Sequence, residues 1–188
     1  MKPSENKSII EALLLSTNRK GIQNLLNWMN KNDFYNSPCS SRYHLAKHGG
    51  LAQHSINVCD AALSVASSLL ALQKKPISFE LMDSIIICSL LHDLGKAGQF
   101  GKQNYIENED PENGSFKTNK ELLYIPHEVR SIAIASQFIE LTEEEQFAIL
   151  YHNGLYGELK SIKGNETELY MILHFADMWA SRVVEREE

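Results

Sequence analysis

The spacing of apolar residues between positions 51 and 75 constrains the fold of this chain more than any other feature. Apolar and small residues recur there every three or four positions, which is the period of one face of an α-helix. Lys74 and Lys75 are favourable at a helix C-terminus, and Pro76 stops the helix. The sequence therefore predicts a long helix from Leu51 to Lys75. Its stripe consists of Leu51, Ser55, Val58, Ala62, Val65, Leu69 and Leu72.

A second helix is predicted to lie in the centre of the molecule. Ser78 is placed to cap its start, and the helical pattern continues to Leu91. The last turns, from Ile85 onward, are apolar on all sides, and a helix of this kind is expected to be buried. Gly95 is placed to end the helix.

Similar signals along the rest of the chain predict an all-α fold. We expect one domain over residues 1–188, a bundle of about six to eight helices. Its core covers about 37–182, and helices within 1–31 pack on that core. The remaining expected helices lie around 9–14, from about Arg19 to Asn30, from Pro126 through Ser136, from the capping box Thr142–Glu145 to Tyr151, and from Leu169 to Val183.

Residues 97–126 interrupt the helical pattern with a polar, irregular stretch. The segment Tyr105–Lys117 contains the tight-turn dipeptide Asn113-Gly114, which indicates a small β-hairpin. A loop of this length in a compact domain is often a lid or a binding element.

Charge and cysteine content exclude several classes of protein. The net charge is −6 and no basic run exceeds two residues, so we expect no binding to long duplex nucleic acid. Cys39, Cys59 and Cys88 form no CxxC pair, so a thiolate zinc site is not expected. The N-terminus lacks the apolar stretch of a signal peptide, and the run Ile85–Leu91 is too short to span a bilayer. We expect a cytoplasmic protein without a membrane partner.

The dipeptide His92-Asp93 is the first candidate for chemistry. It follows an apolar helix that is predicted to be central, where an ionisable pair is costly unless another charge compensates it. A metal ion is one such partner, and an aspartate can bridge two metals through its two oxygens. The alternative is a helix-end pair that meets solvent.

Four other residues are ambiguous when each is taken alone. His54 lies on the predicted long helix and would ordinarily be a hydrogen-bonded core histidine. Asp177 interrupts an apolar stripe, and a salt bridge to Arg182 is its alternative role. His127 and His152 stand at predicted helix ends, where histidines are common.

Taken in order, these residues resemble the H…HD…D pattern, with two intervening histidines, of the HD-domain superfamily of metal-dependent phosphohydrolases. Residues 49–55 (GGLAQHS) resemble its GGL-xx-H-[ST] element, 91–96 (LHDLGK) its LHDxGK element, and 173–178 (LHFADM) its LH-x-AD ending. The resemblance spans about Ser37 to Arg182. The strongest local similarity is to the HD domains of 3′-to-5′ exoribonucleases, which carry an OB-fold for which this sequence has no room.

The resemblance implies a metal centre and its ligands. His54, His92, Asp93 and Asp177 would hold one metal ion, while His127 and His152 would complete a second site that Asp93 bridges. Such nitrogen and oxygen ligands suit Fe²⁺ or Mn²⁺, which we favour, and also Mg²⁺, Co²⁺ or Ni²⁺. The implied chemistry is phosphate-ester hydrolysis by water that two metal ions activate.

Further residues are candidates for contact with the substrate. Lys96, one turn beyond His92, would meet a substrate phosphate as the family's lysine does. His44 and Arg42 precede the glycine pair in a stretch that approaches the substrate in related exonuclease-like proteins. His174 is expected to pack in the core or to support a ligand from behind, and His48 to be a bystander or such a support. Two weaker candidates for substrate binding are Arg130 and Asn153.

Three functions fit these observations. The leading one is a phosphodiesterase that acts on a nucleotide or a short single-stranded oligonucleotide, because two extra histidines favour a dinuclear site. The second is a phosphomonoesterase of the 5′-nucleotidase type. The third is a regulatory module that binds a metal and a nucleotide without turnover.

Overall fold

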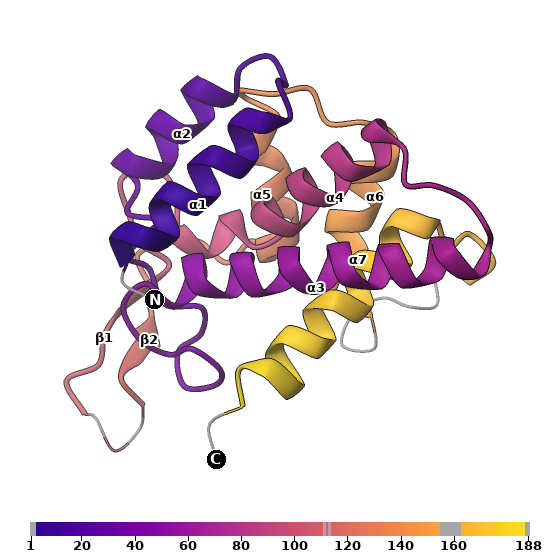
Figure 1. The fold of residues 1–188 in the computed structure, drawn as a ribbon. Helices are drawn as coiled ribbons and strands as arrows, with labels where there is room; N and C mark the ends of the chain where they lie inside the picture. Colours follow the sequence, from indigo (N-terminus) through magenta and orange to yellow (C-terminus); the bar gives the residue numbers. More distant parts are fainter. Residues whose placement is uncertain (1–2, 111, 113, 155–162, 187–188) are drawn as a thin grey trace.

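The computed structural model describes residues 3–110, 112, 114–154 and 163–186 (Figure 1). The prediction of a helical fold is confirmed, since these residues form seven α-helices and a single two-stranded sheet. The helices are α1 (Pro3–Ser16), α2 (Ile22–Lys31), α3 (Gly50–Leu72), α4 (Phe79–Leu91), α5 (His127–Ala135), α6 (Glu143–Tyr151) and α7 (Glu168–Trp179). Two single turns, η1 (Leu94–Ala97, 3₁₀) and η5 (Ala180–Val184, π), extend α4 and α7.

The long helix and the central helix form in the predicted segments, but α3 ends at Leu72, three residues before the predicted end, and Leu69 and Leu72 of the predicted stripe are exposed. α3 crosses the molecule and packs against α1, α4 and α7 (Figure 1). Its first residue is Gly50, where a Cβ would lie 2.0 Å from the Leu45 carbonyl oxygen, so the preceding loop can approach only a glycine. Ser78 caps α4 by accepting a hydrogen bond from the Leu81 amide. The last turns of α4 are buried, as predicted.

α4 ends at Leu91, as the helical pattern predicts, but the predicted role of Gly95 in ending it is wrong. Gly95 lies one turn later, inside the η1 turn that follows. A Cβ on Gly95 would lie 2.4 Å from the His127 carbonyl oxygen, and its amide donates to the Ser131 hydroxyl at 2.8 Å. The glycine therefore serves close packing of η1 on α5, which places His127 beside the end of α4.

The predicted β-hairpin is present in the polar segment. β1 (Tyr105–Glu107) pairs antiparallel with β2 (Phe116–Thr118), and Ile106 lies opposite Lys117. The hairpin extends from the helical body beside the start of α3 (Figure 1). Asn113, in the predicted turn, lies outside the described residues.

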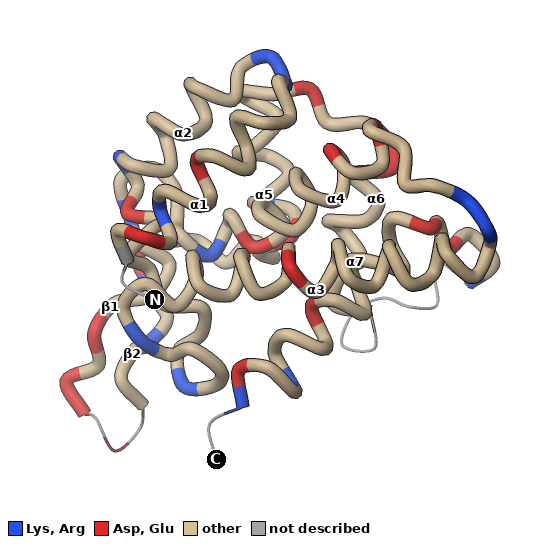
Figure 2. The backbone as a smooth tube through the Cα atoms, in the orientation of Figure 1, with Lys and Arg blue, Asp and Glu red and all other residues tan. Residues whose placement is uncertain are grey.

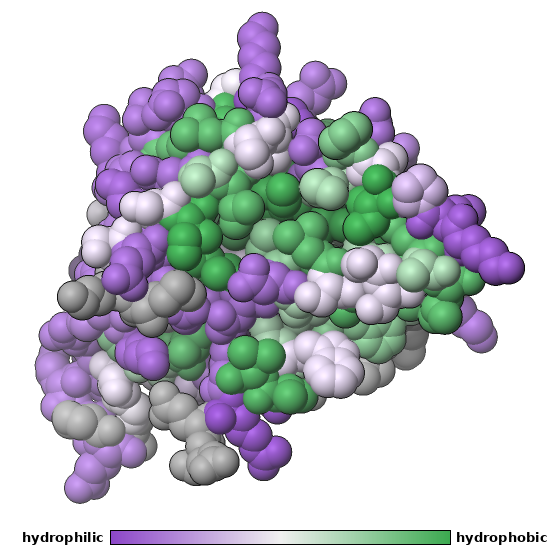
Figure 3. All heavy atoms as spheres, in the orientation of Figure 1, coloured by the Kyte–Doolittle hydropathy of each residue, from purple (hydrophilic) through white to green (hydrophobic). Residues whose placement is uncertain are grey.

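α3 also meets the length and composition criteria for a helix that crosses a membrane. That is weak evidence, because the core helix of a globular domain meets the same criteria. Hydrophobic residues gather in the middle of the face shown in Figure 3, along α3 where α1 and α4 pack, and hydrophilic residues surround them. Since α3 packs on three other helices and buries a histidine, His54, we interpret it as a core helix.

A buried ion pair joins the turn after α1 to α6. Glu145 is fully buried and its carboxylate accepts hydrogen bonds of 2.8 and 2.9 Å from the Arg19 guanidinium. It also accepts from the Ser84 hydroxyl, and from the Thr142 amide within the predicted capping box, which is confirmed. Burial alone would raise the pKa of Glu145, but these hydrogen bonds hold the pKa below its ordinary value of 4.5.

We expect the substitution Glu145→Gln to lower the free energy of unfolding at pH 7 by about 2–4 kcal/mol, because it leaves the Arg19 charge without its partner. The lowered pKa means that Glu145 stabilises the fold above pH 4.5 and loses this effect as the pH falls through the folded-state pKa. The difference between the two proteins should therefore shrink below pH 4.5. Urea unfolding at pH 7 and at pH 4 measures it, with the exposed Glu144→Gln as control. Equal losses in both variants would contradict the assignment.

Candidate metal centre

The carboxylate of Asp93 lies at the centre of a buried cluster of histidines. Its Oδ1 is 3.2 Å from His127 Nε2 and 3.7 Å from His152 Nε2. Its Oδ2 is 3.4 Å from His92 Nε2 and 3.6 Å from His54 Nε2. The two oxygens thus face two different pairs of histidines, which is an arrangement that allows one carboxylate to bridge two metal ions.

Local helix geometry orients two of these histidines. His92 and His152 directly follow the last residues of α4 and α6. Their Nδ1 atoms lie 2.9 Å from the Ser89 carbonyl oxygen and 2.7 Å from the Ile149 carbonyl oxygen, three residues earlier. A carbonyl only accepts, so each Nδ1 carries the proton and each Nε2 keeps its lone pair toward Asp93.

Three other helices supply the remaining predicted ligands. His54 comes from α3, His127 begins α5, and Asp177 lies on α7 with its Oδ1 3.2 Å from His54 Nε2. The structure therefore brings together all six residues predicted as metal ligands. Within each of three groups the donor atoms lie within 4.8 Å of one another: His54 with His92 and Asp93, His92 with His152 and Asp177, and Asp93 with His127 and His152.

The chemistry of these side chains fits divalent cations. Asp93 Oδ1 is buried, and among the described residues it has no hydrogen-bond partner of good geometry, although His127 Nε2 lies 3.2 Å away. A buried carboxylate oxygen without a donor is costly unless a cation compensates its charge. Neutral imidazoles and carboxylates are ligands that Mn²⁺, Fe²⁺ and Co²⁺ accept.

Electrostatic interactions within the cluster shift the pKa of its members. Burial would raise the pKa of Asp93, but the Lys96 ammonium, 2.6 Å from Oδ2, holds the pKa well below its usual range. Burial would likewise lower the pKa of Lys96, but the charge of Asp93 raises it. Burial and the neighbouring His92 lower the pKa of His152 to about 3, so this ring is neutral, as a metal ligand must be.

Most of the predicted substrate contacts surround this cluster. Lys96 lies in η1 and pairs with Asp93, which places its ammonium at the edge of the candidate centre. Asn153 follows His152 and donates to the Glu128 carboxylate, and its Nδ2 is 3.4 Å from His127 Nε2.

Arg42 and His44 line a surface hollow of about 560 Å³ behind the cluster. The His44 ring centroid is 5.0 Å from that of His54. Burial and the nearby positive charges of His54 and Lys96 lower the pKa of His44 to about 4. Other side chains of the same hollow are Tyr43, Lys47, Arg182 and Arg186.

Arg130 has internal contacts instead. Its side chain is buried, and its guanidinium donates to Gln99 Oε1 at 3.1 Å and to the Leu123 carbonyl at 2.8 Å. The Arg130 guanidinium therefore links Gln99 and Leu123, near the two ends of the polar segment 97–126. The predicted contact of Arg130 with substrate is not supported by this position.

The two remaining histidines behave as the sequence suggests. His174 has Nδ1 2.9 Å from the His152 carbonyl oxygen, which supports a residue of the cluster from behind. His48 is largely exposed, and its Nε2 lies 3.3 Å from Glu107 on β1.

Sequence reasoning did not identify Glu185. Its carboxylate oxygens lie 2.9 and 3.1 Å from His54 Nδ1, on the side of the ring opposite Asp93. A glutamate beyond the last predicted ligand carries no local signal, and 131 positions separate it from His54. Cys39 was likewise not connected with the cluster, although its Sγ lies 3.4 Å from His44 Nε2 and it groups with His44 and His54.

In comparisons with known proteins, no family model, no curated protein and no solved structure matches this chain. The resemblance to HD-domain proteins therefore stays a prediction from the ordered motifs.

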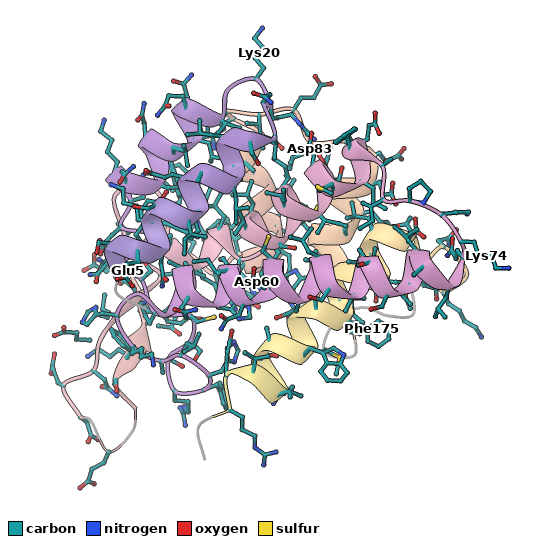
Figure 4. All side chains as sticks on the ribbon, viewed as in Figure 1. Glu5, Lys20, Asp60, Lys74, Asp83 and Phe175 are labelled. Atoms are coloured by element: carbon teal, nitrogen blue, oxygen red, sulfur yellow. The ribbon has the colours of Figure 1, made fainter. Side chains whose placement is uncertain are left out.

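We expect Asp93→Ala to abolish binding of at least one metal ion, because the substitution removes the carboxylate whose two oxygens face the two histidine pairs. Metal analysis after incubation with Mn²⁺ and desalting measures the stoichiometry. Asp60→Ala is the matched control, since Asp60 is exposed on the same helix as His54 (Figure 4). Wild-type metal content in Asp93→Ala would disprove the assignment of the centre.

Proposed function

We propose that this protein is an HD-domain metal-dependent phosphohydrolase that cleaves a phosphodiester in a nucleotide or a short single-stranded oligonucleotide. The observation that carries the proposal is the position of Asp93, whose two oxygens face two separate histidine pairs. A purely structural carboxylate would be expected to use well-aligned donors on both oxygens, whereas Asp93 Oδ1 faces the Nε2 atoms of His127 and His152 without a hydrogen bond of good geometry among the described residues.

The proposed centre holds two ions, with iron or manganese favoured over magnesium, cobalt or nickel. When bound, the ions supply activated water and stabilise negative charge on the phosphoryl oxygens. The residues have distinct tasks: the ligands hold the ions, Asp93 spans them, and Lys96 attracts a substrate phosphate as a compact positive charge. Lys96 is already protonated, since Asp93 raises its pKa.

The charge distribution supports a small anionic substrate. Over the described residues, Lys and Arg are scattered over loops and helix ends, without a continuous basic face of the kind that binds a long duplex (Figure 2). The hollow that contains Arg42 and His44 is lined by more cationic than anionic side chains: Arg42, Lys47, Arg182 and Arg186 against Glu185. The three cysteines are all buried and unpaired, which is consistent with a proposed location in the reducing cytoplasm.

We expect the Mn²⁺-loaded protein to hydrolyse bis-p-nitrophenyl phosphate faster than p-nitrophenyl phosphate, because a dinuclear centre with Asp93 between the ions suits a diester. Initial rates on both compounds measure the preference. Activity on the monoester alone would instead favour a 5′-nucleotidase type of reaction. Metal uptake and nucleotide binding without hydrolysis of either compound, or of a panel of nucleotides and oligonucleotides, would favour a regulatory module.

The substitution Lys96→Ala should retain both metal ions and lower kcat/KM on the diester by roughly 10²-fold, because a cation that meets the substrate phosphate is lost. Metal analysis and steady-state kinetics on the same preparation separate the two effects. Lys102→Ala, which removes an exposed lysine of the same polar segment, provides the control. Loss of metal in Lys96→Ala would assign the lysine to the integrity of the centre instead.

A further inference from the structure

Glu185 is a buried carboxylate that faces the candidate centre from behind. It follows the η5 turn, and its residue is only 8% exposed. Both of its carboxylate oxygens are within hydrogen-bonding distance of His54 Nδ1, and one accepts a 2.9 Å hydrogen bond from Asn57 Nδ2. The same carboxylate lies 3.9 Å from His44 Nε2.

The path of the chain explains how Glu185 reaches this position. α7 continues through the π-turn η5, and the amide of Glu185 donates to the Ala180 carbonyl at 2.9 Å. Asp177 on α7 and Glu185 after η5 therefore approach His54 from the same continuous segment. Asp177 faces Nε2 at 3.2 Å, and Glu185 faces Nδ1 at 2.9 Å. One continuous segment of the chain therefore supplies the carboxylates on both sides of the His54 ring.

A chain of hydrogen bonds fixes the Glu185 carboxylate itself. Asn57, one turn after His54 on α3, donates to Glu185 and accepts at 2.8 Å from Gln53 Nε2. Gln53 in turn accepts at 3.2 Å from Asn6 on α1, whose residue is almost fully buried. The position of Glu185 is therefore determined by α1 and α3 together.

His54 differs from the other histidines of the cluster in its need for this partner. His92 and His152 stand at helix ends and donate from Nδ1 to carbonyls of their own helices. His54 lies within α3, where the neighbouring carbonyls already accept hydrogen bonds of the helix. A side chain must therefore accept the Nδ1–H of His54. A carboxylate behind a metal-binding histidine fixes its tautomer and makes it a stronger ligand.

We propose that Glu185 is a positioning residue of the metal centre: it accepts the Nδ1–H of His54 and thereby directs the Nε2 lone pair of His54 toward Asp93 and Asp177. This rests on the metal centre of the proposed function, and does not depend on which phosphate ester is cleaved. It acts through His54 and touches neither the ions nor the substrate.

The neighbouring cysteine offers a competing arrangement. Cys39, His44 and His54 could hold an ion of their own on the Nδ1 side of His54, and Glu185 would then be a ligand. Burial raises the pKa of the Cys39 thiol to about 11, which opposes the thiolate that such a site needs. The two arrangements make opposite demands on His54 Nδ1, which is protonated in one and unprotonated in the other.

The experiment compares Glu185→Ala, Glu185→Gln and Asn57→Ala with the exposed control Glu168→Gln on α7. Mn²⁺ affinity and stoichiometry are measured by calorimetry. Long-range ¹⁵N–¹H NMR of the proteins loaded with diamagnetic Zn²⁺ reports whether His54 Nδ1 carries a hydrogen-bonded proton. We expect this Nδ1–H signal in the wild type, loss of its hydrogen bond in Glu185→Ala, and a loss of Mn²⁺ affinity of roughly 10–100-fold in that variant. Glu185→Gln keeps an acceptor and should rescue most of the hydrogen bond, and Asn57→Ala should cause a smaller loss.

Three results would overturn the proposal. The first is wild-type affinity and a wild-type Nδ1–H signal of His54 in Glu185→Ala. The second is a wild type that binds no Mn²⁺. The third is loss of one equivalent of metal in Cys39→Ser, which would assign the Nδ1 side of His54 to a thiolate site. Failure of the wild type to hydrolyse any phosphate ester would reject only the proposed function, since affinity and the Nδ1–H signal are measured without turnover.

Discussion

The buried carboxylate of Asp93 is the constraint around which the rest of the molecule is organised. A charge in this position is tolerable only where cations or strong donors surround it. Lys96 supplies one positive charge at 2.6 Å, and four histidines approach from other directions. Every helix from α3 to α7 contributes to this environment, either directly or through the residue that follows its end. The packing of these helices therefore brings the residues around Asp93 together.

Helix ends and close contacts, rather than loops, set the geometry of the centre. His92 and His152 each follow a helix whose last carbonyls accept their Nδ1–H, so secondary structure alone orients them. His127 depends on a tertiary contact instead, because Gly95 lets η1 pack against the start of α5. His54 depends on a still longer connection, through Glu185 and the chain of amides that reaches α1. The ring orientation of His92 and His152 is thus set within a single helix, whereas that of His127 and His54 depends on contacts between segments that are distant in the chain.

Burial explains why so few side chains of the cluster are open to a substrate. His92, His152 and Asp93 are almost completely enclosed, whereas Asp177, Lys96 and His127 are partly exposed. These three are therefore the side chains of the cluster that an anion from solvent could reach. Arg130, which the sequence offered as another such contact, is enclosed, because the guanidinium is needed to fasten the polar segment at Gln99 and Leu123.

The sequence by itself determined the helical fold, the buried end of α4, the capping box at Thr142, the hairpin and the six candidate ligands. These features depend on residue spacing within a few turns, or on an ordered motif, and both are visible in a linear chain. Only the tertiary structure decided that Gly95 is a packing contact, that Arg130 is internal and that Glu185 lies behind His54. Each of those results depends on two segments far apart in the chain, whose approach is set by the packing of whole helices. No local sequence pattern predicts these contacts between distant segments, because the same glycine, arginine or glutamate would be equally acceptable at an exposed position.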